Sequence, residues 1–344
     1  MMSHFFPFAR VFAPVLLSAL FQCAFAQTVY FHPDFSEPGP FVNADPDSGQ
    51  FSHIVQTVPS LSYARFSNEF MDLVRTQEDS ATGGIIRVLR ATPFEPNPET
   101  LFIQLTISAE SVQSAALNAM YFYVGEHFNA DNHSFPGNAL MFAKFSLNFL
   151  ENGFNIKDFS TQNTSKLIAR KKRVTLTWVL NNSKKLVAYK LSPLHEITFN
   201  ALPGTYDLWV DNEPVSLNSK AYPGNSIFSA TKLSNFEMRF RNGLGKIRMH
   251  DILIRNGTSE LKAGEVVVAP NPATRKLIGL WAEHVQLSSV RVFSSWGKNV
   301  HYAAKRIAAD KIEILPEEEL ASGIYIVTFQ NKLGQKHSVR VMIE

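Results

Sequence analysis

The chain has 344 residues, which is enough for two domains or possibly three, and its 45% hydrophobic and 18% charged content is that of a folded protein. Its 33 basic residues nearly balance 30 acidic ones, giving a formal net charge of +3. This balance argues against a nucleic-acid partner, because a polyanion needs a clear basic excess. The 28 phenylalanines favour β-structure.

Residues 1–26 have the pattern of a signal peptide. Arg10 and the amino terminus supply positive charge, a short apolar run follows, and Ala-Phe-Ala precedes Gln27. The run is too short to span a bilayer, and no later segment approaches that length, so we expect no membrane span. Cleavage would remove Cys23, the only cysteine, and leave a mature chain without a disulfide or a thiol ligand.

Residues 27–257 are predicted to form one all-β domain. Short runs with period-two alternation, separated by turn residues, recur nine times between about Leu61 and Arg255, which is typical of a sandwich or barrel. Residues 109–118 (AESVQSAALN) are the best candidate for a helix, of about two turns. The runs VTLTWVLNNS and LPGTYDLWVDNEPV resemble strands of laminin-G-like or concanavalin A-like jelly-rolls. That resemblance implies a jelly-roll sandwich, a fold that often binds carbohydrate on a concave sheet or a loop edge.

A first candidate binding position lies in the run TYDLWVD. Tyr206, Leu208 and Val210 form its apolar face, which places Trp209 on the other side with Asp207 and Asp211. An indole among carboxylates suits a sugar ring, since the ring stacks on the indole and its hydroxyls donate to the acids. The alternative is that Trp209 packs under a covering loop. In VTLTWVL, by contrast, Trp178 lies on the apolar face and is predicted to be core.

Other strands supply possible companions on their polar faces. These are Tyr121 and Tyr123, then Lys144, Ser146 and Asn148, and finally Arg239 and Arg241. If the strands are neighbours, one face carries aromatic platforms and hydrogen-bonding groups, as a saccharide site requires. The alternative is a solvated outer face with scattered aromatic residues. The candidate ligand-binding set is therefore Trp209, Asp207, Asp211, Tyr121, Tyr123, Asn148, Arg239 and Arg241.

The sequence favours a non-catalytic protein. Asp207 and Asp211 are roughly 13 Å apart on an extended strand, too far for the carboxylate pair of a glycosidase, and no nucleophile, metalloprotease or phosphate-loop motif occurs. We expect no cofactor and no metal, although a calcium ion near Asp131 or Asp211 stays an open alternative. Ser80, in Asp-Ser-Ala, resembles the O-glycosylation acceptor of Bacteroidetes.

The tail of the chain has a different character. A linker is predicted at 258–263 and a small immunoglobulin-like β-sandwich at 264–344. Its sequence contains VAPNPA, then VRVFSSWGKNV, then LASGIYIVTFQNKLGQKHSVRVMIE. This order resembles the C-terminal sorting domain of the type IX secretion system of Bacteroidetes-like bacteria. The residues that carry the resemblance are Pro270, Asn271, Pro272, Gly297, Lys298, Gly323 and Tyr325. Ser294-Ser295-Trp296 departs from the family pattern.

The resemblance implies a route for the protein. Such domains fold in the periplasm and are recognised by an outer-membrane translocon. A sorting peptidase usually then removes them, and the cargo is released or attached to surface lipopolysaccharide. We therefore predict a secreted or cell-surface β-sandwich protein that binds carbohydrate. The alternatives are a structural or adhesion component without a small ligand and, less favoured, a glycoside hydrolase.

Overall fold

The structure, a computed structural model, describes residues 28–37, 39–77, 84–192, 197–257, 266–268, 271–282, 285–308, 311–331, 334 and 336–344. Within these ranges the chain forms β-strands and two short 3-10 helices, η1 (Asn138–Leu140) and η2 (Leu287–Ser289). The prediction of an all-β protein is therefore confirmed. In the same ranges, no helix is long and apolar enough to cross a membrane. The predicted signal peptide, the linker, Ser80 and Pro270 lie outside the described residues.

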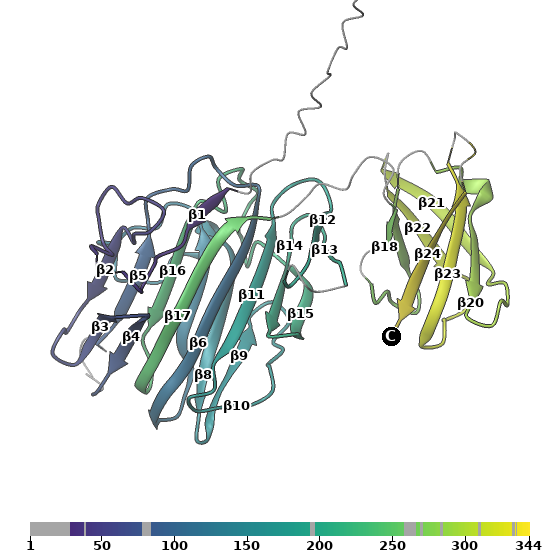
Figure 1. Cartoon of the computed structure of the whole chain (residues 1–344). Helices are drawn as coiled ribbons and strands as arrows, with labels where there is room; N and C mark the ends of the chain where they lie inside the picture. The colour runs from purple at the N-terminus through teal and green to yellow at the C-terminus, as the bar shows by residue number, and fades with distance from the viewer. Residues whose placement is uncertain are drawn as a thin grey trace, which may run out of the picture.

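Two antiparallel sheets build the larger part of the molecule (Figure 1). Sheet I has the strand order β15-β14-β11-β6-β17-β4-β3, with β1 paired to β17. Its strands are β1 (Val29–Phe31), β3 (Ser62–Ser67), β4 (Phe70–Arg75), β6 (Thr100–Ser114), β11 (Val174–Asn181), β14 (Thr205–Val210), β15 (Glu213–Lys220) and β17 (Leu244–Asn256).

Sheet II has the order β10-β9-β8-β7-β16-β5-β2. Its strands are β2 (His53–Gln56), β5 (Ile86–Arg90), β7 (Ala116–Gly125), β8 (Met141–Leu150), β9 (Gly153–Asp158), β10 (Ile168–Ala169) and β16 (Asn235–Phe240). A separate two-stranded ribbon consists of β12 (Val187–Tyr189) and β13 (Phe199–Ala201).

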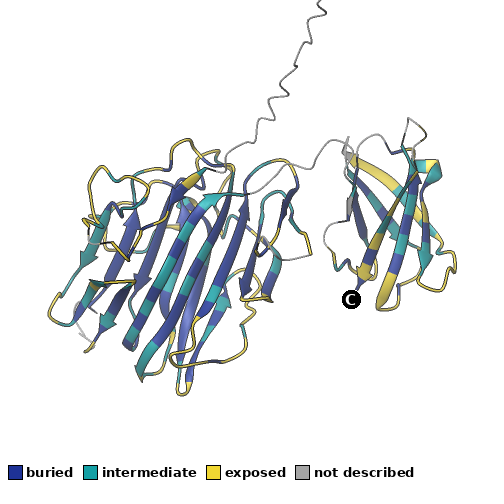
Figure 2. Ribbon diagram, in the orientation of Figure 1, coloured by how far each residue is buried: buried dark blue, intermediate teal, exposed yellow. Residues whose placement is uncertain are grey.

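The main core lies between the two sheets, where the strands are mostly buried (Figure 2). Trp178 of β11 meets Phe145 of β8 edge to face, with ring centroids 4.8 Å apart. Phe145 in turn stacks on Phe122 of β7 at 4.4 Å. The predicted core position of Trp178 is confirmed. The many phenylalanines thus fill the sandwich, whose apolar area is the main source of its stability.

The expected helix at residues 109–118 is wrong. Residues 109–114 continue β6, which pairs with β17 from Leu101 to Ser114, and residues 116–118 begin β7. The segment AESVQSAALN has good helix formers, but a long partner strand satisfies its backbone groups instead. Tertiary pairing overrides local propensity here.

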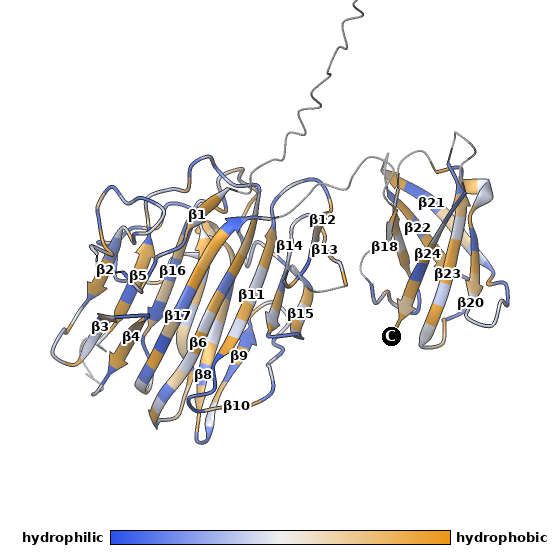
Figure 3. Cartoon of the chain, viewed as in Figure 1, coloured by the Kyte–Doolittle hydropathy of each residue, from blue (hydrophilic) through white to orange (hydrophobic). Residues whose placement is uncertain are grey.

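The tail forms its own small sandwich with its own core (Figure 3, orange positions on the strands). One sheet has the order β18-β19-β22-β21 and the other β20-β23-β24. The strands are β18 (Val267–Val268), β19 (Ile278–Trp281), β20 (Arg291–Ser294), β21 (Tyr302–Ala308), β22 (Lys311–Pro316), β23 (Gly323–Gln330) and β24 (Lys336–Ile343). The predicted fold class, a jelly-roll-type sandwich followed by a smaller β-sandwich, is thereby confirmed.

Candidate functional site

The predicted ligand residues lie on two different sheets. Asp207 and Trp209 belong to β14 of sheet I, and Asp211 follows that strand. Tyr121 and Tyr123 of β7, Asn148 of β8 and Arg239 of β16 belong to sheet II, and Arg241 follows β16. The expectation of one shared face is wrong, because the core of the sandwich separates the two groups.

Trp209 is a buried packing residue. It is 3% exposed and packs in a cluster with Phe102, Val179 and Tyr189 on the side of sheet I that faces away from the main core. The β12–β13 ribbon covers it, and the ring of Phe199 lies 4.6 Å from its ring. As the alternation in β14 predicts, Trp209 lies on the opposite face of the strand from the core residues Leu208 and Val210. A second layer of the protein covers that face. Trp209 therefore cannot stack on a sugar in this structure.

Asp207 is buried beside Trp209 and accepts hydrogen bonds from two groups, one of which, Tyr189, itself accepts from Trp209. Trp209 Nε1 donates to Tyr189 Oη at 2.9 Å, Tyr189 donates to Asp207 Oδ2, and Asn218 N donates to Asp207 Oδ1. Burial raises the pKa of Asp207 to about 7, because the charged form loses its hydration. Asp211 is exposed, and its Oδ1 accepts from Thr175 N at 2.8 Å. Asp207 is therefore inaccessible to a ligand, and Asp211 lies at the end of β14, apart from the buried Trp209 ring.

Sheet II brings the remaining predicted residues onto one face. Arg239 of β16 lies opposite Tyr121 of β7. Tyr123 of β7 lies opposite Lys144 of β8, the strand that flanks β7 on its other edge. Three of the set are structural. Asn148 donates to Asn155 at 2.9 Å and accepts from Asn118 N, Tyr123 is almost fully buried, and Arg239 is fully buried. Burial raises the pKa of the Tyr123 hydroxyl far above its ordinary value.

A buried charge network holds a loop against this face. Glu237 accepts from Arg87 and from Arg239, and all three side chains are inaccessible to solvent or nearly so. Arg87 also donates to the carbonyl oxygens of residues 129, 130 and 132, and Arg239 donates to those of residues 133 and 134. We call Arg87, Glu237 and Arg239 the arginine clamp. It fixes loop 126–137 over part of sheet II.

Gly125 lets this loop leave the sheet. A Cβ atom there would lie 2.3 Å from the carbonyl oxygen of Leu140, and the neighbouring Glu126 N donates to that same oxygen at 2.9 Å. A side chain at this position would push the two segments apart. The close approach allows the chain to turn back and cover the strands.

Several aromatic rings and basic side chains stay accessible on the outer face of sheet II, beside the covering loop. Tyr121 stacks on Phe159 (5.8 Å between centroids, 18° between planes) and meets Phe135 at 5.1 Å. Lys144 Nζ and Lys157 Nζ lie 5.2 and 5.7 Å from the Phe159 centroid, and the Arg241 guanidinium lies 4.5 Å from that of Phe135. We call this set the aromatic–basic surface: Tyr121, Phe135, Lys144, Lys157, Phe159 and Arg241. All six side chains are partly exposed.

A pocket of about 380 Å³ adjoins the surface at the edge of the sandwich. Lys144 and Phe159 belong to both, and Lys220 and Tyr222 line its other side. Burial lowers the pKa of Lys144, since its ammonium group has lost part of its hydration. A volume of this size is in the range of small-molecule sites.

Sequence reasoning missed Phe135 and Phe159. Phe135 lies in a loop and Phe159 directly follows β9, and period-two alternation says nothing about positions outside strands. The only available signal was an aromatic residue among turn formers in HSFPGN and KDFSTQ. Their roles depend on the fold of the loops.

The two acids of the covering loop, Glu126 and Asp131, have different surroundings. Glu126 is held by Lys232, Ser229 and Thr231, and the hydrogen bonds from these groups lower its pKa against the opposing effect of burial. Asp131 is exposed on the covering loop. Across the part of the chain that the structure describes, no group of three or more potential ligands gathers at one point.

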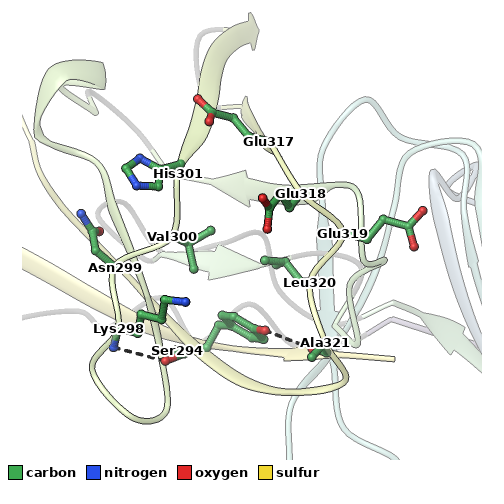
Figure 4. Close-up of a pocket in the computed structure, with 11 residues that line it drawn as sticks. Ser294, Lys298, Asn299, Val300, His301, Glu317, Glu318, Glu319, Leu320 and Ala321 are labelled. Atoms are coloured by element: carbon green, nitrogen blue, oxygen red, sulfur yellow. Dashed lines mark hydrogen bonds between the residues drawn. The ribbon is translucent and has the colours of Figure 1, made fainter.

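The tail contains a pocket of about 420 Å³ (Figure 4). Lys298, from the Gly-Lys turn, and Tyr325, from the Gly-Ile-Tyr motif, both line it, although they are far apart in the sequence. Tyr325 donates to Ala321 O at 3.1 Å, and Gly297 adopts a positive φ of 75° in the turn. Asn271 accepts from Met342 N at 2.8 Å, which ties the start of the tail to its last strand. Of the motif residues, Lys298 and Tyr325 thus line one pocket, Gly297 forms a turn, and Asn271 bonds to the last strand.

Comparison with known proteins identifies the tail. Residues 267–344 match the secretion system C-terminal sorting domain. The tail is therefore a sorting domain of this kind, and it implies export of the chain by type IX secretion. No curated protein matches the chain.

Solved structures similar to the chain include three β-rich domains. The carbohydrate esterase vb_24B_21 of bacteriophage phi24B has 10% identity and a TM-score of 0.41, and the match covers 67% of this chain and 100% of that one. The Emp46p carbohydrate recognition domain, metal-free form, has 9% identity and a TM-score of 0.40 (67% and 97% covered). A Bacillus subtilis protein with a galectin-like fold has 9% identity and a TM-score of 0.40 (68% and 98% covered). Likenesses this remote give no argument about ligands.

Proposed function

We propose that this protein is exported through the type IX translocon, with a signal peptide at 1–26 and a sorting domain at 264–344, and that its sandwich at 27–257 binds carbohydrate outside the cell. A sorting peptidase would act on the tail at the surface, and the cargo would be released or anchored to lipopolysaccharide. The cargo needs no cofactor for this role. The aromatic–basic surface is the observation that carries the binding proposal.

The surface has the parts that sugar binding needs. Three rings are partly exposed, and the Tyr121 ring lies 5.1 Å from that of Phe135 and 5.8 Å from that of Phe159. Sugar C–H groups pack on aromatic rings of this kind. Long cationic side chains beside them can donate hydrogen bonds to hydroxyl and ring oxygens. The covering loop is fixed by the arginine clamp, so the platform is formed before the ligand arrives, which reduces the entropic cost of binding.

Binding is tested with the chain from residue 27 onward. Phe159→Ala and Tyr121→Ala should each weaken retention on the best ligand of a glycan array by about tenfold, which corresponds to about 1.4 kcal/mol. The matched control is Trp296→Ala, which removes an exposed aromatic residue of the tail and should change nothing. If no glycan binds, or if both platform variants bind like the parent, the proposal is wrong and a structural or adhesion role takes its place.

Export is tested by truncation. A chain ending at residue 263 should accumulate in the periplasm of a host with a type IX system, because the segment that the translocon recognises is gone. A reporter that carries a signal peptide and residues 264–344 should reach the surface or the medium. Normal surface delivery of the truncated chain would contradict the proposed route.

A further inference from the structure

We infer that the ligand of the aromatic–basic surface is an acidic polysaccharide, one that carries carboxylate or sulfate groups along its chain. This inference rests on the proposed carbohydrate binding and adds the chemical class of the ligand. It comes from the charges on sheet II and at its edge.

The cations of the surface have no acidic partners. Among the described residues, Lys144, Lys157 and Arg241 form no ion pair with Asp or Glu. Lys144 has one long hydrogen bond of 3.4 Å, to the amide oxygen of Asn138, and all three cations lie over aromatic rings. Three cations held over rings and left uncompensated form a site for anions.

The acids nearest in the network do not neutralise these cations. Glu237 is enclosed by Arg87 and Arg239, so the arginine clamp itself carries an excess of one positive charge. Glu126 is paired with Lys232. The covering loop contributes one exposed carboxylate, Asp131, together with the imidazole of His133. Asp158, which lies between Lys157 and Phe159 in the sequence, is buried and accepts hydrogen bonds from Tyr206 and Ser219, and in the part of the chain that the structure describes it forms no ion pair with Lys144, Lys157 or Arg241. The three cations of the surface and the one excess charge of the clamp outweigh Asp131 and Asp158, so this region is positive by about two charges, although the whole chain is nearly balanced.

The adjoining pocket repeats the pattern. It is lined by two lysines, Lys144 and Lys220, and none of its lining residues is acidic: Phe142, Ala143, Lys144, Phe159, Ser160, Tyr206, Lys220, Ala221, Tyr222, Pro223 and Gly224. The Lys144 ammonium is partly dehydrated, and an anion beside it would replace the lost hydration. A uronate or sulfated sugar could put its ring on Phe159 and its anionic group between the lysines.

Rings and cations on one face explain why the ligand should be both a sugar and an anion. A neutral polysaccharide would use the rings and leave Lys144, Lys157 and Arg241 uncompensated. A simple anion would use the cations and leave the rings empty. A chain of acidic sugars satisfies both sets at once, and its repeating charges match cations that are spread across four neighbouring strands, from β9 to β16.

The test compares polymers of different charge on the chain from residue 27 onward. Polygalacturonate and dextran sulfate are the anionic probes, and unmodified dextran and cellulose oligomers are the neutral ones. Binding is measured by titration calorimetry at 20, 100 and 300 mM NaCl. We expect an anionic probe to bind at least tenfold more tightly than the neutral probes at 100 mM NaCl, and to weaken as salt rises.

Variants locate the site. The triple variant Lys144→Gln, Lys157→Gln, Arg241→Gln should lose about tenfold in affinity for the anionic probe, or about 1.4 kcal/mol, because it removes the three cations that the anionic groups would contact. The matched control is Lys172→Gln, an exposed lysine in the basic run 170–173 of the same domain. Thermal unfolding verifies that the variants fold. The single variant Lys157→Gln changes one partly exposed side chain and provides a second measurement if the triple variant is unstable.

The outcomes separate the two proposals. Equal binding of neutral and anionic probes, with sensitivity to Phe159→Ala, would overturn the acidic-ligand inference and leave carbohydrate binding standing. Loss of anion binding in Lys172→Gln but not in the triple variant would also overturn the inference, because it would move the site. Tighter binding of a single-stranded oligonucleotide than of either acidic polysaccharide would overturn it as well. Binding of no polysaccharide at all would remove the proposed function itself.

Discussion

Asp207 makes a specific prediction about stability and pH. Burial raises its pKa from 3.8 to about 7, a shift of about three units, and each unit corresponds to about 1.4 kcal/mol. The native state therefore holds the proton more tightly than the unfolded chain does. The stability linked to this proton is fully present below about pH 4 and is lost as the pH rises through about 7, in total about 4 kcal/mol.

Asp207→Asn removes this titration and keeps the shape of the side chain. Its amide oxygen can still accept from Asn218 N, and Tyr189 still lies beside the amide group. The free energy of unfolding of the parent minus that of the variant should fall by about 4 kcal/mol between pH 4 and pH 8. Urea denaturation at several pH values, followed by tryptophan fluorescence, measures both quantities. Asp131→Asn, at an exposed carboxylate, is the matched control. A difference that stays constant within about 1 kcal/mol would refute the burial argument.

Three further predictions concern packing and exposure. Glu237→Gln leaves two buried guanidinium groups uncompensated and should cost about 3–5 kcal/mol in urea denaturation, and a loss under about 1 kcal/mol would speak against the arginine clamp. Trp209→Phe loses the hydrogen bond to Tyr189 and should lower stability by about 1 kcal/mol while glycan binding stays unchanged; weaker binding would return Trp209 to the site. Trp296→Ala, at a side chain that is 94% exposed, should shift the unfolding free energy by less than about 0.5 kcal/mol, and calorimetry of the tail's transition checks it.

Strand phase was predictable from the sequence because each strand has only two faces. Leu208 and Val210 lie in the main core as alternation in β14 predicts, and so does Trp178 in β11. What alternation could not show is whether a second layer covers the other face. The β12–β13 ribbon comes from a segment that follows β11, and its position over Trp209 depends on contacts with sheet I. The misplacement of Trp209 therefore has a tertiary cause.

The sheet II site was predictable in part for the same reason. Tyr121 and Arg241 are at the surface, whereas Tyr123, Asn148 and Arg239 are enclosed by neighbours and by the covering loop. The pairing of β7 with β16 joins residues that are far apart in the sequence. Whether the side chains of β7, β8 and β16 share a face depends on these pairings, which the sequence alone does not specify. The two rings from outside the strands, Phe135 and Phe159, were beyond reach, because loop conformation has no periodic signature.

The sorting domain was recognisable for another reason. Its motifs sit at turns and at one pocket, where particular residue types are required by backbone conformation, as at Gly297 with its positive φ. Such requirements leave traces in the sequence in a fixed order. A binding surface made of rings and lysines from scattered positions leaves none.

The way the arginine clamp holds its loop has an evolutionary consequence. Arg87 and Arg239 donate to the main-chain oxygens of residues 129, 130, 132, 133 and 134, and every residue type has such an oxygen. The side chains of Asp131 and His133 are exposed to solvent, and the hydrogen bonds from the two arginines do not involve them. Mutation can therefore exchange them at little thermodynamic penalty while the loop keeps its course. Relatives of this protein could diversify what they recognise at these two positions without rebuilding the scaffold underneath.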